Sequence, residues 1–111
     1  MDDKIRKYLF DIQISIDSIY DYIGTKRDFF EYQNNKLLRR GVERELEIIG
    51  EALNRVLKLD DNIKISSSKR IVGLRNFIIH NYDKVDDTII WGIISKDLLL
   101  LRSEVKSLMQ E

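Results

Sequence analysis

The sequence predicts an all-α protein, an antiparallel bundle of four long helices and one short helix that forms a single domain over residues 1–111. The chain contains no proline and only five glycines, as in helical proteins with short connections. Its apolar residues recur in steps of three and four, which is the spacing of one helix face. A chain of 111 residues suffices for one hydrophobic core and is too short for a second.

The first helix begins near Ile5 and ends at Gly24, a residue typical of helix C-caps. Its apolar stripe comprises Ile5, Leu9, Ile12, Ile16, Ile19 and Ile23. The segment 25–33 follows, and its aromatic residues between Asp28 and Tyr32 predict one or two helical turns that close an end of the bundle.

A second long helix is predicted from a cap at Asn34 or Asn35 to about Leu59. Its stripe is Leu38, Val42, Leu46, Ile49, Leu53 and Val56. Gly50 inside this helix costs about 1 kcal/mol relative to alanine. We therefore expect another helix to approach closely at Gly50.

The polar residues of this helix have two interpretations. Glu43, Arg44, Glu47 and Glu51 are spaced as i,i+3 and i,i+4 pairs and can form a solvated face. Alternatively, one glutamate supports the functional residues of the next helix, and Glu47 is our candidate for this role.

The third long helix follows a polar loop at 60–65, with a cap among the serines at 66–68, and runs to about Asn81. Its core stripe is Ile71, Leu74 and Ile78, and residues 82–85 are expected to turn the chain. Asp86 or Asp87 then caps the last helix, whose stripe is Ile90, Ile94, Leu98, Leu101, Val105 and Leu108.

The last helix is apolar on more than one side, because Ile89, Trp91, Ile93 and the four leucines at 98–101 add to its stripe. One four-helix core cannot absorb all of them. We expect a homodimer interface here, and the alternative is a helix buried centrally within the monomer.

Charge and composition exclude several classes of protein. Lysine plus arginine and aspartate plus glutamate both number 19, so nucleic acid can be contacted only locally. The absence of cysteine is compatible with the cytoplasm. The acidic start and the lack of a long apolar run predict no signal peptide and no membrane span.

Polar groups concentrate between Arg75 and Tyr82, in a segment that contains the only histidine, His80. On one helix, Arg75 and His80 are five residues apart and point about 140° from each other. This spacing favours a site that is shared across a symmetry axis between two copies of the helix.

Histidine and arginine together suit RNA cleavage by the 2′-hydroxyl without a metal ion. Two copies of His80 facing each other can serve as general acid and general base. Asn76 is a candidate to orient the imidazole, and Lys69 and Arg70 are candidates to bind neighbouring phosphates. The alternative is that His80 is a structural residue at a helix end and Arg75 an ordinary ion-pair partner.

Other chemistries find little support in the sequence. It contains no glycine-rich phosphate loop, and a single histidine without cysteine makes a poor zinc site. We therefore predict neither a metal nor a cofactor.

The chain resembles the HEPN superfamily and, within it, the HepT-like toxins. Arg75, His80 and Tyr82 match the family pattern of arginine, a polar residue, a short spacer, histidine, any residue and tyrosine. Residues 42–52 resemble a second signature of the family, and residues 87–98 resemble the last helix of the family's members. The resemblance covers nearly the whole chain.

This resemblance implies a homodimeric, metal-independent endoribonuclease toxin with Arg75 and His80 in a composite cleft. It also implies a minimal nucleotidyltransferase antitoxin as partner, which silences the toxin by attaching AMP to Tyr82. Two alternatives remain: a non-catalytic helical subunit that binds such a nucleotidyltransferase, and a helical dimer whose polar motif only stabilises its interface.

Overall fold

The computed structural model describes residues 2–81 and 86–110, with the backbone alone at 79–81, and this part of the chain is helical with short connections. The elements are α1 (Asp3–Ile23), α2 (Phe29–Gln33), α3 (Lys36–Leu59), α4 (Ser68–Asn81), α5 (Asp87–Gly92), the π-helical turn η2 (Ile93–Asp97) and α6 (Leu98–Met109). Since α5, η2 and α6 follow one another directly, they form one long last helix. The predicted fold class of four long helices and a short one is confirmed.

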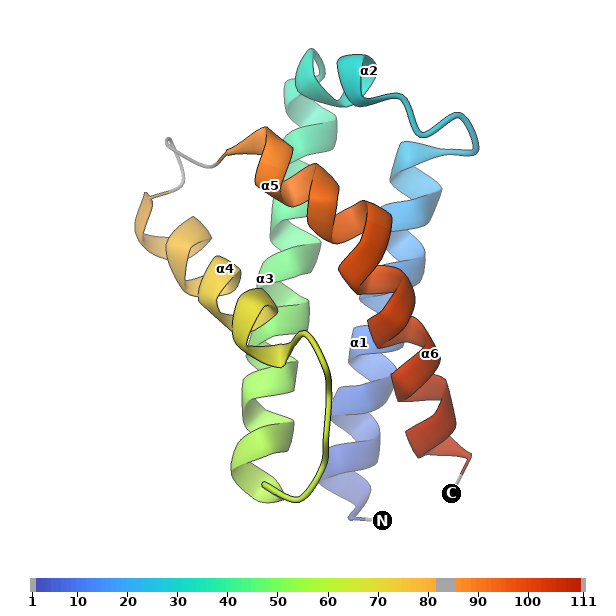
Figure 1. The fold of residues 1–111 in the computed structure, drawn as a ribbon, viewed down its shortest axis with the longest axis vertical. Coiled ribbons are helices and arrows are strands. Elements are labelled where there is room, and N and C mark those ends of the chain that lie inside the picture. The colour runs from blue at the N-terminus through green and yellow to red at the C-terminus, as the bar shows by residue number, and fades with distance from the viewer. Residues whose placement is uncertain (1, 82–85, 111) are drawn as a thin grey trace.

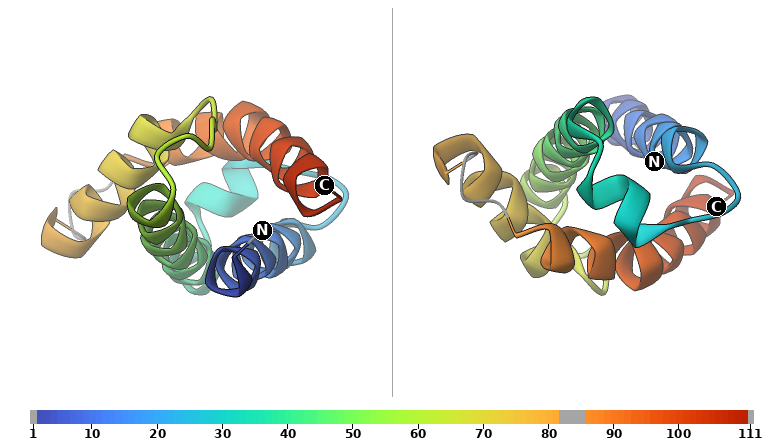
Figure 2. Two further views of the ribbon diagram at one scale, coloured as in Figure 1. Left: turned by 90° about the horizontal axis from the view of Figure 1, so that it is seen from below. Right: turned by 90° about the horizontal axis from the view of Figure 1, so that it is seen from above.

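The long helices alternate in direction, and both ends of the chain lie at the same end of the bundle (Figure 1). Helix α1 packs mainly against α3 and also against α6. Helix α4 packs against the other side of α3 and stands outside the ring formed by α1, α3 and the last helix (Figure 2). Helix α2 lies across the end of the bundle that is opposite to the chain termini (Figure 2).

The predicted helix limits are largely confirmed, because side chains close the helices where the sequence indicates. The side chain of Asn35 accepts a hydrogen bond from the amide of Leu38, at 3.0 Å, and begins α3. Asp86 caps α5 through the amide of Thr88, at 2.8 Å. Gly24 ends α1 with a φ of 78°, a value that glycine adopts without strain.

The predicted apolar stripes form the core. Only Ile23, Leu38, Leu74 and Leu108 among their members are partly rather than fully buried. Tyr32 of α2 is fully buried, and its ring centre lies 5.4 Å from that of Trp91. The expectation that aromatic residues close an end of the bundle is therefore confirmed for Tyr32 and not for Phe30, which is 71% exposed.

The π-helical turn explains how the last helix buries more apolar residues than one regular stripe allows. A π-turn contains more residues than an α-turn, so neighbouring side chains can face the same way. Here Ile93 and Ile94 are both buried, as are Asp97 and Leu98. The surplus that remains exposed on this helix consists of Ile89, Leu99 and Leu100.

The beginning of α4 is attached to the last helix by polar side chains. The hydroxyl of Ser67 donates to Asp97 at 3.2 Å, and the guanidinium of Arg70 pairs with Asp97 at 3.0 Å. The amide and hydroxyl of Ser66 both donate to Glu104, at 3.1 Å. A cap was expected among the serines at 66–68, and α4 begins directly after Ser67, whose carbonyl accepts a hydrogen bond from the amide of Ile71 at 3.0 Å. The hydroxyls of Ser66 and Ser67 bind carboxylates of the last helix. No described helix is long and apolar enough to cross a membrane.

Candidate functional site

Arg75 lies where α4 comes closest to α3. A Cβ atom added to Gly50 would collide with the Cβ of Arg75 and would lie 2.8 Å from its Cγ. Only a residue without a side chain allows this approach, which confirms the close helix contact expected at Gly50. The crossing places the guanidinium of Arg75 beside the polar face of α3.

Glu51 is the glutamate that binds Arg75. Its carboxylate forms an ion pair with Nη2 of Arg75 and accepts a hydrogen bond from Nε of Arg55 at 2.9 Å. The hydrogen bond from Arg55 is the main cause that lowers the pKa of Glu51, and the charge of Arg75 also lowers it. Asn76 accepts a further hydrogen bond from Nη1 of Arg75, at 2.6 Å. Arg75 is thus held in one orientation by two neighbours.

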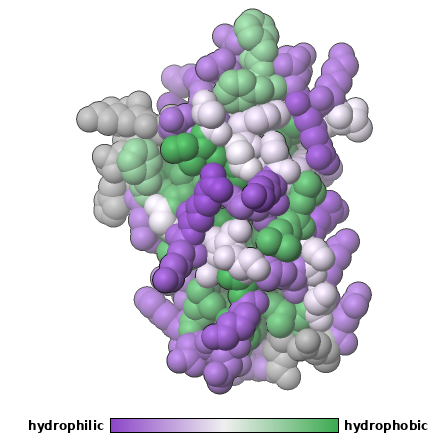
Figure 3. Space-filling view, viewed as in Figure 1, coloured by the Kyte–Doolittle hydropathy of each residue, from purple (hydrophilic) through white to green (hydrophobic). Residues whose placement is uncertain are grey.

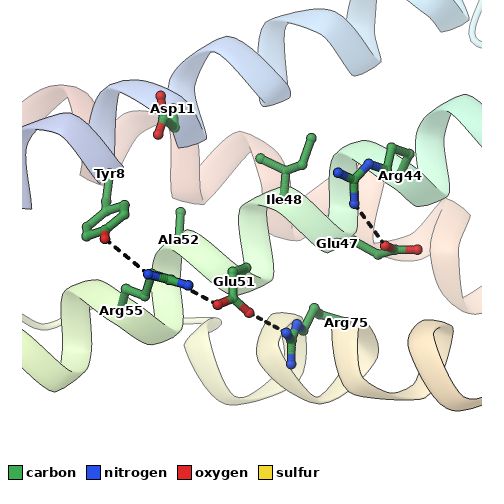
Figure 4. Close-up of a pocket in the computed structure, with 9 residues that line it drawn as sticks. All are labelled: Tyr8, Asp11, Arg44, Glu47, Ile48, Glu51, Ala52, Arg55 and Arg75. Atoms are coloured by element: carbon green, nitrogen blue, oxygen red, sulfur yellow. Dashed lines mark hydrogen bonds and ion pairs between the residues drawn. The ribbon is translucent and has the colours of Figure 1, made fainter.

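Glu51, Arg55 and Arg75 line a hollow of about 410 Å³ between α1, α3 and α4 (Figure 4). At one end, the hydroxyl of Tyr8 accepts a hydrogen bond from Arg55 at 3.3 Å, and the chain of contacts continues through Glu51 to Arg75. At the other end, Arg44 pairs with Glu47 at 3.2 Å. Guanidinium groups from two helices therefore reach one concave surface, an arrangement suited to binding an anion.

The other predicted residues lie around α4. Glu47 lines the same hollow as Arg75, but its ion pair is with Arg44. Lys69 and Asn76 line a second hollow of about 350 Å³ on another side of α4. Arg70 is directed toward the π-helical turn, where it pairs with Asp97. The structure thus groups Glu47 with Arg75 and separates both from Arg70.

Two residues of the motif are not described in full. His80 lies in the last turn of α4, where the structure describes the backbone only. Tyr82 and the turn expected at 82–85 lie outside the described residues. The roles assigned to His80 and Tyr82 therefore remain predictions.

An apolar groove of about 250 Å³ runs between α4 and α5. It is lined by Leu74 and Phe77 from α4 and by Ile89 and Ile93 from α5 and η2. Phe77 and Ile89 are exposed despite their size. Hydrophobic side chains gather on the surface over these two helices (Figure 3).

The sequence interpretation did not select Glu51, Arg55 or Tyr8. Glu51 follows Gly50 directly, so the residue that signals the close approach also marks the neighbouring carboxylate. Arg55 is one turn further along α3 and binds Glu51 as an i,i+4 pair. Tyr8 belongs to α1, and no local pattern in the sequence places it beside α3.

Comparison with known proteins shows similarity along most of the chain. A protein of Methanocaldococcus jannaschii named "Putative RNase MJ1380" is 37% identical over 105 residues, which are 92% of this chain and 94% of the relative. "Putative RNase TTE0752" of Caldanaerobacter subterraneus is 35% identical over 85 residues, 75% of each chain. No solved structure shows a significant match. The family described as "Ribonuclease HepT-like" matches residues 12–108. The chain therefore belongs to the HepT-like ribonuclease family of the HEPN superfamily.

Proposed function

We propose that this protein is a metal-independent endoribonuclease, the toxin of a type VII-like toxin–antitoxin system. Its active site is composite: Arg75 and His80 of two protomers meet at the cleft of a homodimer. The observation that carries the proposal is the fixed orientation of Arg75, which Glu51 and Asn76 hold at the edge of an open hollow.

The proposed reaction needs only groups that this chain supplies. The 2′-hydroxyl attacks the adjacent phosphorus and loses its proton to His80 of one protomer, which acts as general base. The bond from phosphorus to the 5′-oxygen breaks, and His80 of the second protomer donates a proton to that oxygen. The products are a 2′,3′-cyclic phosphate and a 5′-hydroxyl. Arg75 stabilises the negative charge of the pentavalent intermediate.

The apolar groove between α4 and α5 supports the proposed homodimer. Phe77 and Ile89 expose large apolar side chains on α4, which carries the motif, and on α5, which follows it. Exposed apolar surface of this kind marks an interaction site more often than free surface. A second copy that covers this groove brings the two α4 helices together, so that each contributes its His80 to one site.

Cleavage of RNA by the purified protein in the presence of EDTA tests the proposal. The parent chain should cut single-stranded RNA, whereas Arg75→Ala and His80→Ala should lose about 10²-fold or more of the rate. Arg102→Ala, which breaks an ion pair between α6 and α1, should retain it. Equal RNA decay in the His80→Ala variant would contradict the proposal. A stable complex with a nucleotidyltransferase and no cleavage would favour the non-catalytic alternative.

The proposed regulation concerns Tyr82. A minimal nucleotidyltransferase antitoxin attaches AMP to its hydroxyl, which places phosphate charge beside the site where substrate phosphate binds. Intact-mass analysis of the chain, produced with and without such an antitoxin, should show additions in AMP units. Tyr82→Phe should lack them and remain toxic. Additions on the Tyr82→Phe variant would exclude this tyrosine as the target.

A further inference from the structure

The hollow between α1, α3 and α4 contains two arginines that the proposed chemistry does not use. Arg44 and Arg55 project from α3 on either side of Glu51, and their side chains are 68% and 55% exposed. Arg75 of α4 reaches the same hollow. Three guanidinium groups are thus accessible to a ligand within one concave surface (Figure 4).

Glu51 shows where this hollow stabilises negative charge. Its carboxylate lies between Arg55 and Arg75 and receives a donor from each. The hydrogen bond from Arg55 chiefly lowers the pKa of Glu51, and the charges of Arg75, Arg55 and Lys58 lower it further. The carboxylate therefore stays ionised and offsets part of the positive charge, so a phosphate must bind to donors of the arginines that Glu51 does not use.

The existing ion pairs leave the arginines able to bind a ligand. Exposed pairs such as Arg44–Glu47 and Arg55–Glu51 contribute about 0–1 kcal/mol each. A guanidinium carries five N–H donors. Arg55 uses Nε for Glu51 and Nη1 for Tyr8, and Arg44 uses Nη1 for Glu47. Donors therefore remain for a phosphate, which arginine can bind through two parallel hydrogen bonds.

We propose that this hollow binds two phosphates of the RNA chain next to the one that is cleaved, one at Arg44 and one at Arg55. The inference rests on the proposed ribonuclease function and extends it to a substrate-binding subsite. Arg75 lies between this subsite and the proposed cleavage site, because it lines the hollow and also belongs to the motif of α4. The RNA strand therefore passes from the motif on α4 across α3 toward Tyr8 of α1.

The acidic residues of the hollow limit how strongly it can bind RNA. Glu47, Glu51 and Asp11 balance the three arginines, and Lys7 pairs with Asp11 at 2.8 Å. The subsite is thus not a strongly basic surface that holds any polyanion. Binding should be moderate in strength and sensitive to salt, since each phosphate contact releases counterions from the RNA.

The test measures binding separately from cleavage. All variants are made in the His80→Ala background, and the dissociation constant of a fluorescein-labelled single-stranded RNA is measured by anisotropy at several salt concentrations. The double variant Arg44→Gln/Arg55→Gln should bind about tenfold more weakly, with a salt slope smaller by about 1.4. Arg102→Gln is the control, since it also removes an arginine from an ion pair, which is partly exposed and lies on another face.

The outcomes separate this subsite from the ribonuclease function. If the double variant binds RNA as tightly as the Arg102→Gln control and with the same salt slope, the subsite is overturned while the proposed function stands. If the parent chain neither cleaves nor binds RNA, both are overturned. Circular dichroism of each variant establishes that the helices are intact, as expected for substitutions of exposed side chains.

Discussion

The side chain of Arg75 lies directly on the bare backbone of Gly50, so a methyl group at position 50 and the present position of α4 exclude each other. The nearest atoms are the Cβ and Cγ of Arg75. Because the Cβ is fixed to the backbone, the collision cannot be relieved by side-chain rotation alone. The distance between α3 and α4 therefore depends on this one glycine.

Gly50→Ala should destabilise the fold and reduce RNA cleavage. The displacement of α4 costs more than the roughly 1 kcal/mol that alanine returns in helix propensity, for a net loss of about 1–2 kcal/mol. The melting temperature should fall by roughly 5–10 °C. Gly41→Ala in the same helix is the control, because its new Cβ would meet the ring of Tyr22 at an ordinary 3.5 Å. An equal response of both variants would contradict the proposed role of the contact.

Arg70 should contribute to stability through Asp97. The Asp97 side chain is 8% exposed, and its Oδ2 makes no hydrogen bond within the described part of the chain, so it depends on the 3.0 Å ion pair with Arg70. Arg70→Gln should therefore cost about 2–3 kcal/mol in urea unfolding. In a double-mutant cycle with Asp97→Asn, the coupling should exceed that of the surface pair Lys7–Asp11, expected below about 1 kcal/mol. Equal couplings would refute this assignment.

The groove between α4 and α5 should be required for dimerisation. Phe77→Glu places a charge on the apolar surface proposed to meet the second copy, and should convert a dimer into a monomer by light scattering. RNA cleavage should be lost with it, because the composite site needs two chains. Leu37→Glu is the control, since Leu37 is 84% exposed at the start of α3, away from this groove. A dimer that persists in Phe77→Glu would place the interface elsewhere.

Glu43 should make stability depend on pH. Burial raises the pKa of its carboxyl above the ordinary value, and the charge of Arg40 opposes this effect. The folded chain thus binds this proton more tightly than the unfolded chain, and stability falls as pH rises through the interval between the two pKa values.

The variant Glu43→Gln removes this dependence. It should melt at a higher temperature than the parent at pH 7, and the gain should shrink toward zero below about pH 4. Glu31→Gln, at an exposed position of α2, should show no comparable gain. A gain in melting temperature that is the same at pH 7 and below about pH 4 would exclude ionisation of Glu43 as the cause.

The helices could be predicted from the sequence because their signals are local. The side chains of Asn35 and Asp86 cap helices through amides two or three residues away. The spacing of apolar residues in steps of three and four indicates which face of a helix is buried, without indicating which helix covers it. Gly50 also predicted one contact between helices, because a glycine that weakens its own helix implies that another helix approaches closely there.

The site could be predicted only in part, because its contacts depend on how α4 crosses α3. Glu47 and Glu51 are one helical turn apart and are equivalent in pattern; the crossing at Gly50 pairs Arg75 with Glu51. Arg70 looked free to bind phosphate, but the π-helical turn brings the buried Asp97 to it. No periodicity announces a π-turn, so neither pairing could be read from residue spacing.

The π-turn at Ile93–Asp97 is also the place where the last helix can lose a residue at least cost to its register. Because a π-turn holds one residue more than an α-turn, loss of a single residue there would restore regular α-helix and leave the residues downstream on about the same faces. A deletion within α6 itself would instead rotate everything beyond it by about 100°. A deletion before Leu101 in α6 would therefore take Leu101 and Val105 out of the core and turn Glu104 away from Ser66.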